Sequence, residues 1–358
     1  MDKKVRNPAA IPLSPASVVA QLADVSRSFY LTLRVLPRSV RHSIGLAYLL
    51  ARTSDTIADT EIVPLEKRLE ALRAFLDRIS GRTTVPLDFG GLATNQSLPA
   101  EKILLESVED IAATLTACPP SDQDEIRAVL SIIVGGQQLD LERFSAANSS
   151  SVIALSTDTD LDDYTYRVAG CVGEFWTRLC RRRLFPLAPV DETFLLSHGV
   201  RFGKGLQLVN ILRDLSRDLR QGRCYLPAEK LRELGLVPRD LLDPRCEQKL
   251  RPLYDLYLDR AEAHLDAGWE YTMALPRNQV RVRLACAWPL LIGARTAGQL
   301  RVQPILDPAR RVKVGRAEIR SILARSILFY PSKTLWNRQF SRARGVGRNA
   351  VDSGQGFH

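Results

Sequence analysis

Apolar residues recur along most of this chain with the period of an α-helix. Between residues 65 and 79 they fall at positions 65, 69, 72, 75, 76 and 79, which share one helix face. Comparable runs predict helices over residues 17–29, 40–60, 65–79, 101–117, 121–144, 160–181, 191–221, 227–233, 247–274, 278–300 and 316–330. Alternating β-branched segments bounded by turns are nearly absent. We therefore predict an all-α fold.

Segments rich in proline, glycine and polar residues interrupt this pattern and predict the domain organisation. Residues 1–16 are basic and rich in proline, and we expect a loose N-terminal tail. Residues 80–99, rich in Gly, Pro, Thr and Asn, are the best internal loop candidate. Residues 336–358 are rich in Arg, Gly and Ser, which favours a disordered tail. A single helical domain is expected over residues 17–335.

Composition narrows the class of protein. The 358 residues are 45% hydrophobic and 25% charged, as in ordinary globular proteins, and the net charge is +10. That charge suits diphosphates, anionic lipids or nucleic acid, or else it is a solvated basic surface. No apolar run approaches the ~20 residues of a membrane span, and the N-terminus does not read as a signal peptide. Six scattered cysteines without a C-x-x-C pair predict reduced thiols and a cytoplasmic protein.

Two pairs of aspartates carry the clearest chemical signal. Asp55 and Asp59 are four residues apart in an apolar segment, and so are Asp214 and Asp218. Residues at this spacing share one helix face, and carboxylates in a buried segment are costly unless they are paired or bound to a cation. One such pair occurs often by chance, as a surface ion pair. Two pairs, each preceded by an arginine (Arg52 and Arg213), favour a site for Mg²⁺ and a diphosphate.

Further residues join these pairs by spacing alone. Gln207 lies two helical turns and Asn210 one turn before Asp214, and an amide oxygen can complete a Mg²⁺ shell. A buried polar network between helices explains the amides about equally well. Ser26, Arg27 and Ser28 are either diphosphate ligands or an ordinary helix end. The glycines in residues 164–174 either pack helices tightly or leave room for a ligand.

Four stretches together resemble the squalene/phytoene synthase family, the head-to-head prenyl transferases. They are S-R-S-F at residues 26–29, Y-L-L-A-R-T-S-D-T-I-A-D at 48–59, Y-T-Y-R-V-A-G-C-V-G-E at 164–174, and Q-L-V-N-I-L-R-D at 207–214, followed by G-R-C-Y-L-P at 222–227. In order and spacing they cover residues 20–330. The resemblance implies an isoprenoid-synthase helical bundle in which the acid pairs face each other across a hydrophobic cavity.

The resemblance also implies roles for individual residues. Metal ligands would be Asp55, Asp59, Asn210, Asp214 and Asp218, holding Mg²⁺ or Mn²⁺. Substrate contacts would come from Ser26, Arg27, Ser28, Phe29, Tyr48, Arg52, Gln207 and Arg213. Tyr164 matches a family tyrosine near the carbocation and the leaving group.

Three positions depart from the family pattern. Arg217 stands where many relatives have an acid, which lowers the negative charge of the second motif. Ala58 likewise replaces an acid of some relatives. Ala285 stands where eukaryotic squalene synthases have an aromatic residue that can stabilise a cation.

The segment from Arg310 to Arg316 guides the choice of reaction within the family. It is similar to a basic element of squalene synthases, and we expect Lys313 and Arg316 to hold NADPH phosphates unless the segment is only a solvated loop. This favours a squalene synthase that condenses two farnesyl diphosphates through presqualene diphosphate. Phytoene or dehydrosqualene synthases, which release a proton and need no NADPH, are the alternative. A hydroxysqualene-forming relative is a further one.

Two alternatives lie outside this chemistry. A non-catalytic helical protein binding nucleic acid or anionic membrane has no need for two acid pairs preceded by arginine, and no aromatic and basic stripe for nucleic acid is present. A degenerate paralogue that only assists a partner enzyme is the second. Independently, Arg338, Arg342, Arg344 and Arg348 predict weak peripheral attachment to an anionic membrane.

Overall fold

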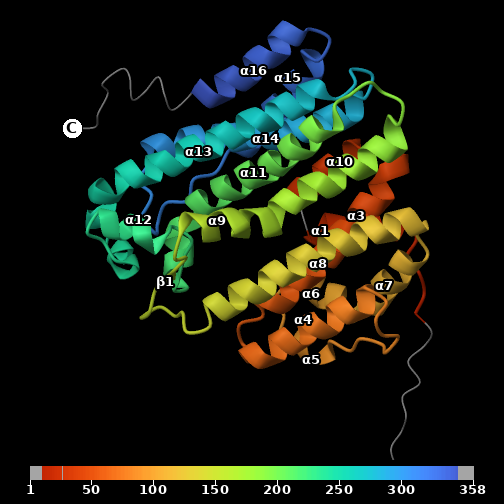
Figure 1. Ribbon diagram of the computed structural model, residues 1–358, viewed down its shortest axis with the longest axis horizontal. Coiled ribbons are helices and arrows are strands. Elements are labelled where there is room, and N and C mark those ends of the chain that lie inside the picture. Colours follow the sequence, from red (N-terminus) through yellow and green to blue (C-terminus); the bar gives the residue numbers. More distant parts are fainter. Residues whose placement is uncertain (1–9, 26, 346–358) are drawn as a thin grey trace, which may run out of the picture. The chain divides into compact units, whose positions relative to one another are not determined.

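The computed structural model describes residues 10–25 and 27–345, and almost all of its regular structure is helical (Figure 1). This confirms the all-α prediction. In the described part, the one sheet consists of β1 (Ile153–Ala154) and β2 (Arg223–Cys224), paired in parallel with Ile153 opposite Arg223. The chain groups into two compact units, of residues 10–142 with 178–184, and of residues 143–177 with 185–345.

The first unit is built on helix α3 (Arg38–Asp59), which contacts most of its other helices. These are α1 (Pro15–Val25), α2 (Arg27–Val35), α4 (Leu65–Ile79), α5 (Gly90–Ala93), α6 (Pro99–Glu106), α7 (Val108–Thr116), most of α8 (Pro120–Arg143) and the end of α10 (Cys171–Leu184). Leu46, Leu50 and Ile57 of α3 are fully buried. Each contributes about 1.5–3 kcal/mol by burial, so the opposite face of α3 is held in a fixed orientation.

Within this unit the buried Asp122, at the start of α8, links α8 to α3 and to the end of α10. Its carboxylate accepts hydrogen bonds from Ser43 of α3 (2.6 Å) and Arg182 (2.8 Å), and an ion pair with Arg183 spans 3.0 Å. Burial alone raises the pKa of Asp122, but the bonds from Ser43, Arg183 and Arg182 outweigh it and hold the pKa below its usual 3.8. The ionised form therefore stabilises the folded unit.

We expect Asp122→Asn to lower the free energy of unfolding by about 2–3 kcal/mol near pH 7, because two arginines lose a buried partner. The lowered pKa means that this contribution is present above pH 3.8 and is lost as the pH falls through the folded pKa. Denaturant titrations at pH 7 and at pH 3 should therefore show a difference that shrinks in acid. The exposed Asp124→Asn, on the same helix, is the control. An equal loss at both pH values would contradict this account.

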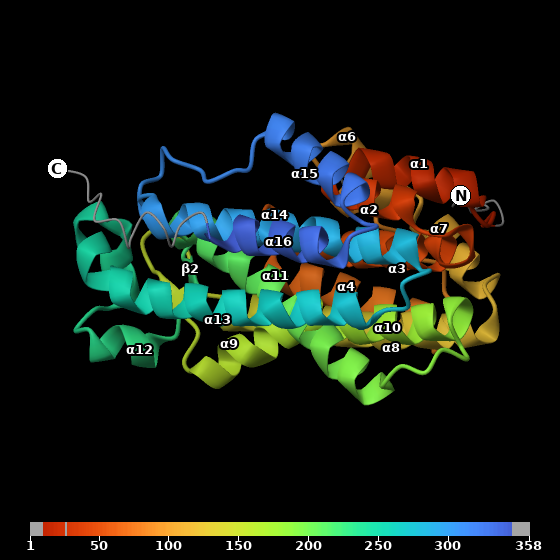
Figure 2. The same ribbon diagram turned by 90° about the horizontal axis from the view of Figure 1, so that it is seen from above.

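Three long helices form the centre of the second unit. They are α11 (Glu192–Arg220), α13 (Glu247–Ala274) and α14 (Val280–Val302), which pack side by side (Figures 1 and 2). The others are α9 (Asp158–Thr165), the π-turn η1 (Tyr166–Gly170), the start of α10, α12 (Ala228–Glu233), η2 (Pro238–Leu242), η3 (Pro244–Cys246), α15 (Arg316–Leu328) and α16 (Lys333–Gly345).

Glycines place α11 in backbone contact with the π-turn and α10. A Cβ on Gly173 would lie 1.9 Å from the carbonyl oxygen of Gly199, and one on Gly203 would lie 2.1 Å from that of Ala169. Real side chains do not tolerate such distances, so these positions require glycine. Tight packing is therefore the use that the structure makes of Gly173.

Several predicted boundaries differ from the observed ones. The run at 101–117 is two helices separated at Ser107, and the run at 160–181 is interrupted by the π-turn. Residues 336–345, expected to be disordered, are part of helix α16. That prediction was wrong because Trp336 and Phe340, one turn apart, bury their rings against Trp269 of α13, Phe340 at 4.6 Å between ring centroids. Residues 1–9 and 346–358 of the expected tails lie outside the described residues.

Two sequence expectations concern thiols and membranes. All six cysteines are free, and five of them are buried. Across residues 10–25 and 27–345, no helix is both long enough and apolar enough to span a membrane.

Candidate functional site

Four predicted site residues share one face of α3 in the first unit. Tyr48, Arg52, Asp55 and Asp59 follow each other at intervals of three or four residues, as residues on a single helix face do. Asp59 is exposed and the other three are partly buried. The helix core on the opposite side holds this polar face in place. Helix α2 includes Arg27, Ser28 and Phe29 in its backbone, and Ser26 lies outside the described residues.

Asp55 has a strongly perturbed carboxyl group. Its pKa is raised to about 7, because burial and the negative charge of Asp59 raise it more than Arg52 and a hydrogen bond from Gln137 of α8 lower it. Arg52 itself is ion-paired with Glu101 of α6. Because burial and a neighbouring carboxylate both disfavour the ionised form of Asp55, a bound cation would stabilise that form.

The second unit carries the corresponding face on α11. Gln207, Asn210, Asp214 and Asp218 are again three or four residues apart, and all are partly buried. The Asn210 amide donates to the Gln207 side-chain oxygen at 3.5 Å. Four oxygen-bearing side chains therefore follow each other along one face toward the C-terminal end of the helix.

Arginines neutralise the Asp214 carboxylate. Arg213 donates two hydrogen bonds to it, at 3.1 and 2.5 Å. Arg311 reaches the same carboxylate at 3.5 Å from the loop between α14 and α15. This loop is the basic segment that the sequence singles out at residues 310–316, and its Lys313 and Arg316 are exposed. The structure thus joins the basic segment to the second acid motif.

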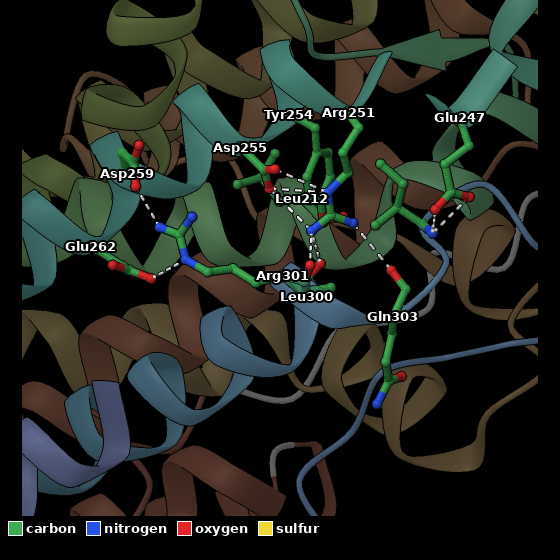
Figure 3. Close-up of polar contacts among 11 residues, drawn as sticks. Leu212, Glu247, Arg251, Tyr254, Asp255, Asp259, Glu262, Leu300, Arg301 and Gln303 are labelled. Carbon is green, nitrogen blue, oxygen red and sulfur yellow. Dashed lines mark hydrogen bonds and ion pairs between the residues drawn. The ribbon is translucent and has the colours of Figure 1, made fainter. Parts of the chain in front are cut away.

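A polar network on α13 holds the start of this loop (Figure 3). Arg251 donates to the carbonyl oxygens of Leu300 (2.9 Å) and Gln303 (3.3 Å), at the C-terminal end of α14. Glu247 accepts from the backbone N–H of Ile305 at 3.1 Å. The Arg251 guanidinium also interacts favourably with the helix dipole at this end of α14. Together these contacts fix where α14 ends and where the loop begins.

The same loop is tied to α11 beside the acid motif. Ser216, two residues after Asp214, donates to the carbonyl oxygen of Leu306 at 3.2 Å. On the other side Tyr254 of α13 donates to the carbonyl oxygen of Leu212 at 3.0 Å (Figure 3). Helices α11 and α13 and the loop therefore position Arg311 and Asp214 together.

Tyr164 is the penultimate residue of helix α9, and the π-turn that follows the helix is a distortion that is frequent at functional sites. Its ring stacks on buried Tyr225 with centroids 4.6 Å apart, and Phe144 meets Tyr225 edge-on at 5.3 Å. Tyr225 follows a turn at Gly222, which has φ +81° and leaves no room for a Cβ beside Asn148. The turn thereby fixes the platform on which Tyr164 rests.

The three departures from the family pattern have different surroundings. Arg217 is exposed on α11, and no ion pair joins it to another described residue. Ala58 and Ala285 are buried, at 8% and 1% exposure. Ala285 sits in a closely packed part of α14, so its small size is part of the helix packing.

The oxygen donors suit a hard divalent cation. In the described part of the chain, no three His, Cys, Asp or Glu side chains lie close enough to hold a metal ion by themselves. Mg²⁺ is commonly bound by one or two carboxylates, with substrate phosphates and water completing its shell. The pairs Asp55–Asp59 and Asp214–Asp218 match that pattern, as does the raised pKa of Asp55.

Three contacts of this site were not foreseen from the sequence. They involve Gln137, which donates to Asp55, Arg311, which pairs with Asp214, and Tyr225, which stacks on Tyr164. Each had a partial signal: Gln137 is an amide inside an apolar helix, Arg311 belongs to the basic segment, and Tyr225 lies in the quoted G-R-C-Y-L-P stretch. None of these signals predicts which residue Gln137, Arg311 or Tyr225 contacts.

Comparisons with known proteins agree with these motifs. A family described as Squalene/phytoene synthase matches residues 22–318. A presqualene diphosphate synthase of Rhodopseudomonas palustris is 26% identical, over 87% of this chain and 96% of its own length. One of Sinorhizobium fredii is 30% identical over 71% and 77%. A bifunctional lycopene cyclase/phytoene synthase of Phaeosphaeria nodorum is 29% identical over 74% of this chain, which spans 43% of that longer protein.

Solved structures share the fold. TcSQS in complex with the ligand E5700 matches with a TM-score of 0.73 at 21% identity, over 95% of this chain and 99% of that one. Squalene synthase HpnC from Alicyclobacillus acidocaldarius matches with a TM-score of 0.57 at 20% identity, over 80% and 92%. At these identities the likeness establishes the helical fold.

Proposed function

Because this chain belongs to the squalene/phytoene synthase family and is a prenyl transferase of that type, we propose that it condenses two farnesyl diphosphates head to head. The product of the first step would be presqualene diphosphate, which NADPH then reduces to squalene. The observation that supports this most directly is the pair of polar faces on α3 and α11, each with two carboxylates and an arginine. Presqualene diphosphate synthases are also among its relatives of similar length.

Members of this family use divalent metal ions to bind prenyl diphosphates. We assign Asp55 and Asp59 on α3, and Asn210, Asp214 and Asp218 on α11, as the ligands of Mg²⁺. The metal, when bound, neutralises the departing diphosphate as a Lewis acid. Arg52 and Arg213, now paired with Glu101 and Asp214, would exchange these carboxylates for diphosphate oxygens. Tyr48, Gln207 and the S-R-S-F residues 26–29 would complete the diphosphate contacts.

The proposed chemistry has two steps. In the first, the C–O bond of one donor breaks and diphosphate leaves, the double bond of the second donor attacks the allylic cation, and loss of a proton closes a cyclopropane. In the second, the remaining diphosphate leaves and a hydride from NADPH ends the rearrangement at squalene. Tyr164, supported by Tyr225, would face the cation with its ring. An apolar, water-excluding environment would keep the cation from hydrolysis.

We assign the basic segment 310–316 to the second step. Lys313 and Arg316 are exposed and, within the described residues, have no carboxylate partner, so their charges are available to the phosphates of NADPH. Arg311 is different, because it is already paired with Asp214. Within the segment, Arg311 is therefore directed to the acid motif, and Lys313 and Arg316 are directed to solvent.

The purified chain should convert farnesyl diphosphate and Mg²⁺ to presqualene diphosphate without NADPH, and to squalene when NADPH is added. The double variant Lys313→Gln/Arg316→Gln should raise KM for NADPH about 25-fold, at about fivefold per lost phosphate contact, and leave the first step unchanged. Arg239→Gln, an exposed arginine elsewhere in the same unit, serves as the control.

Other products would decide against parts of the proposal. Phytoene from geranylgeranyl diphosphate, or dehydrosqualene, formed equally well without NADPH would show that the second step is proton loss. Presqualene diphosphate as the end product in both conditions would remove the reduction from the proposal. No Mg²⁺-dependent consumption of any prenyl diphosphate would reject the catalytic assignment itself.

A further inference from the structure

A cavity of about 440 Å³ opens between α14, α15 and α16, outside the residues assigned to catalysis. Its wall is apolar where Leu291, Ile322 and Phe329 line it. Its other lining residues include four arginines, Arg295, Arg325, Arg338 and Arg342. All three helices belong to the second unit (Figures 1 and 2). The cavity thus combines an apolar wall with several positive charges.

The positive charge of this cavity is largely uncompensated. Arg295 is paired with Glu318, the one acidic residue between positions 316 and 345, a stretch with seven basic residues. Arg325, Arg338 and Arg342 are exposed and make no ion pair with other described residues. By contrast, neighbouring Arg344 pairs with Asp266 at 2.9 Å. Three guanidinium groups around one cavity therefore lack an anion, although carboxylates elsewhere on the unit are paired.

Two buried polar atoms in the cavity wall also lack a partner. They are Nη1 of Arg295 and the side-chain oxygen of Gln339, both shielded from solvent without a hydrogen bond. Leaving such an atom without a hydrogen bond costs free energy, because it has lost its contact with water and gained no partner. A ligand with an anionic oxygen to accept from Arg295 and a hydroxyl to donate to Gln339 would remove this cost.

Exposed aliphatic side chains adjoin the cavity. Ile327 and Leu328, at the C-terminal end of α15, are 56% and 70% exposed, and Leu335, which lines the cavity, is 41% exposed. Basic residues beside exposed aliphatic ones are typical of helices that lie in the interface of a membrane. A soluble phosphate compound would satisfy the arginines, but it would leave these side chains in water.

We propose that α15 and α16 dock on an anionic membrane, with the headgroup of an anionic phospholipid in this cavity. The phosphate would lie among Arg325, Arg338 and Arg342, a headgroup hydroxyl would reach Gln339, and Ile327 and Leu328 would enter the acyl boundary. This proposal is independent of the reaction assigned above, because it concerns other residues and needs no prenyl substrate.

Co-sedimentation of the full chain with phospholipid vesicles tests the electrostatic part. We expect binding to vesicles of phosphatidylcholine with phosphatidylglycerol, and much less to phosphatidylcholine alone. Arg338→Gln/Arg342→Gln should lower the partition coefficient about 25-fold, at about fivefold for each basic side chain near an anionic surface. The control Arg232→Gln/Arg239→Gln removes the same charge from exposed positions around α12 and η2 and should lower it less than about twofold.

The apolar part has its own variant. Ile327→Ser/Leu328→Ser should weaken binding even in high salt, where electrostatic attraction is screened. Leu187→Ser/Val237→Ser is the matched control, since Leu187 and Val237 are 93% and 53% exposed elsewhere in the unit. Circular dichroism checks that each variant is folded. If the α16 double variant is not folded, Arg325→Gln alone should lower partitioning about fivefold.

Clear results would overturn the proposal. If the α16 variant and its charge control weaken vesicle binding equally, the net charge of the protein explains the binding and the cavity does not. Equal binding to vesicles with and without phosphatidylglycerol, or no binding to either, would exclude a headgroup site. Displacement of the protein from vesicles by inorganic phosphate at the concentration of the lipid phosphate would assign the cavity to a soluble anion.

Discussion

Asp55→Asn and Asp214→Asn, made separately, are each expected to lower kcat/KM for the prenyl diphosphate by about 10³-fold or more. Each change removes one metal-binding charge, and the loss of a ligand that neutralises a departing diphosphate corresponds to about 4 kcal/mol of transition-state stabilisation. Steady-state release of diphosphate, measured across a range of Mg²⁺ concentrations, checks this. The Mg²⁺ concentration needed for half-maximal rate should rise as well.

Stability measurements separate this effect from misfolding. The pKa of Asp55 is raised from 3.8 to about 7, so the metal-free protein loses stability as the pH rises from about 3.8 to about 7, and the full loss persists above that pH. Asp55→Asn should therefore leave the free energy of unfolding unchanged or higher while activity is lost, which is the usual trade-off at a functional site. Asp124→Asn, at an exposed position of α8, should alter neither property. If both motif variants keep activity and Mg²⁺ dependence, the two acid motifs are not the site.

Gly173→Ala is expected to have the largest effect on stability, lowering the free energy of unfolding by about 3 kcal/mol or more. The added methyl group would lie 1.9 Å from the carbonyl oxygen of Gly199, and 2.9 Å from the backbone nitrogen of Val200. These atoms belong to the backbone of α11 and cannot move aside as a flexible side chain would. Helices α10 and α11 would have to separate, which also displaces the α11 face that bears Asp214.

Urea denaturation followed by far-ultraviolet circular dichroism measures this loss. Gly91→Ala is the matched control, because a Cβ at Gly91 meets no atom within 4 Å. Replacing that helical glycine should be neutral or stabilising by up to about 1 kcal/mol. A Gly173→Ala protein as stable as the wild type would mean that α10 and α11 are less closely packed than the distances indicate.

Much of each polar face could be predicted from the sequence, because helix periodicity is a local property. The intervals from Tyr48 through Arg52 and Asp55 to Asp59 place them on one side of any regular helix. The same holds for Gln207, Asn210 and Asp214. What periodicity could not predict is their partners, such as Gln137 for Asp55, 82 positions away in the sequence.

The C-terminal region shows the opposite case, in which tertiary contacts override composition. Residues 336–345 have the polar, arginine-rich composition typical of disorder. They are helical because Trp336 and Phe340 bury their rings on Trp269, and because Trp336 donates to the carbonyl oxygen of Ser326 at 2.9 Å. Two aromatic residues one turn apart outweigh the composition of the segment, and the helix that they hold in place contributes Arg338, Gln339 and Arg342 to the wall of the arginine-lined cavity.

The sequence by itself determined that this protein is all-helical, that it carries two acid motifs on single helix faces, and to which family it belongs. Those properties depend on spacing within short segments. Only the tertiary structure decided that Arg311 pairs with Asp214, that Tyr225 supports Tyr164, and that three unpaired arginines gather around one cavity. These features depend on how distant segments pack, and packing is set by the shape and volume of many side chains at once.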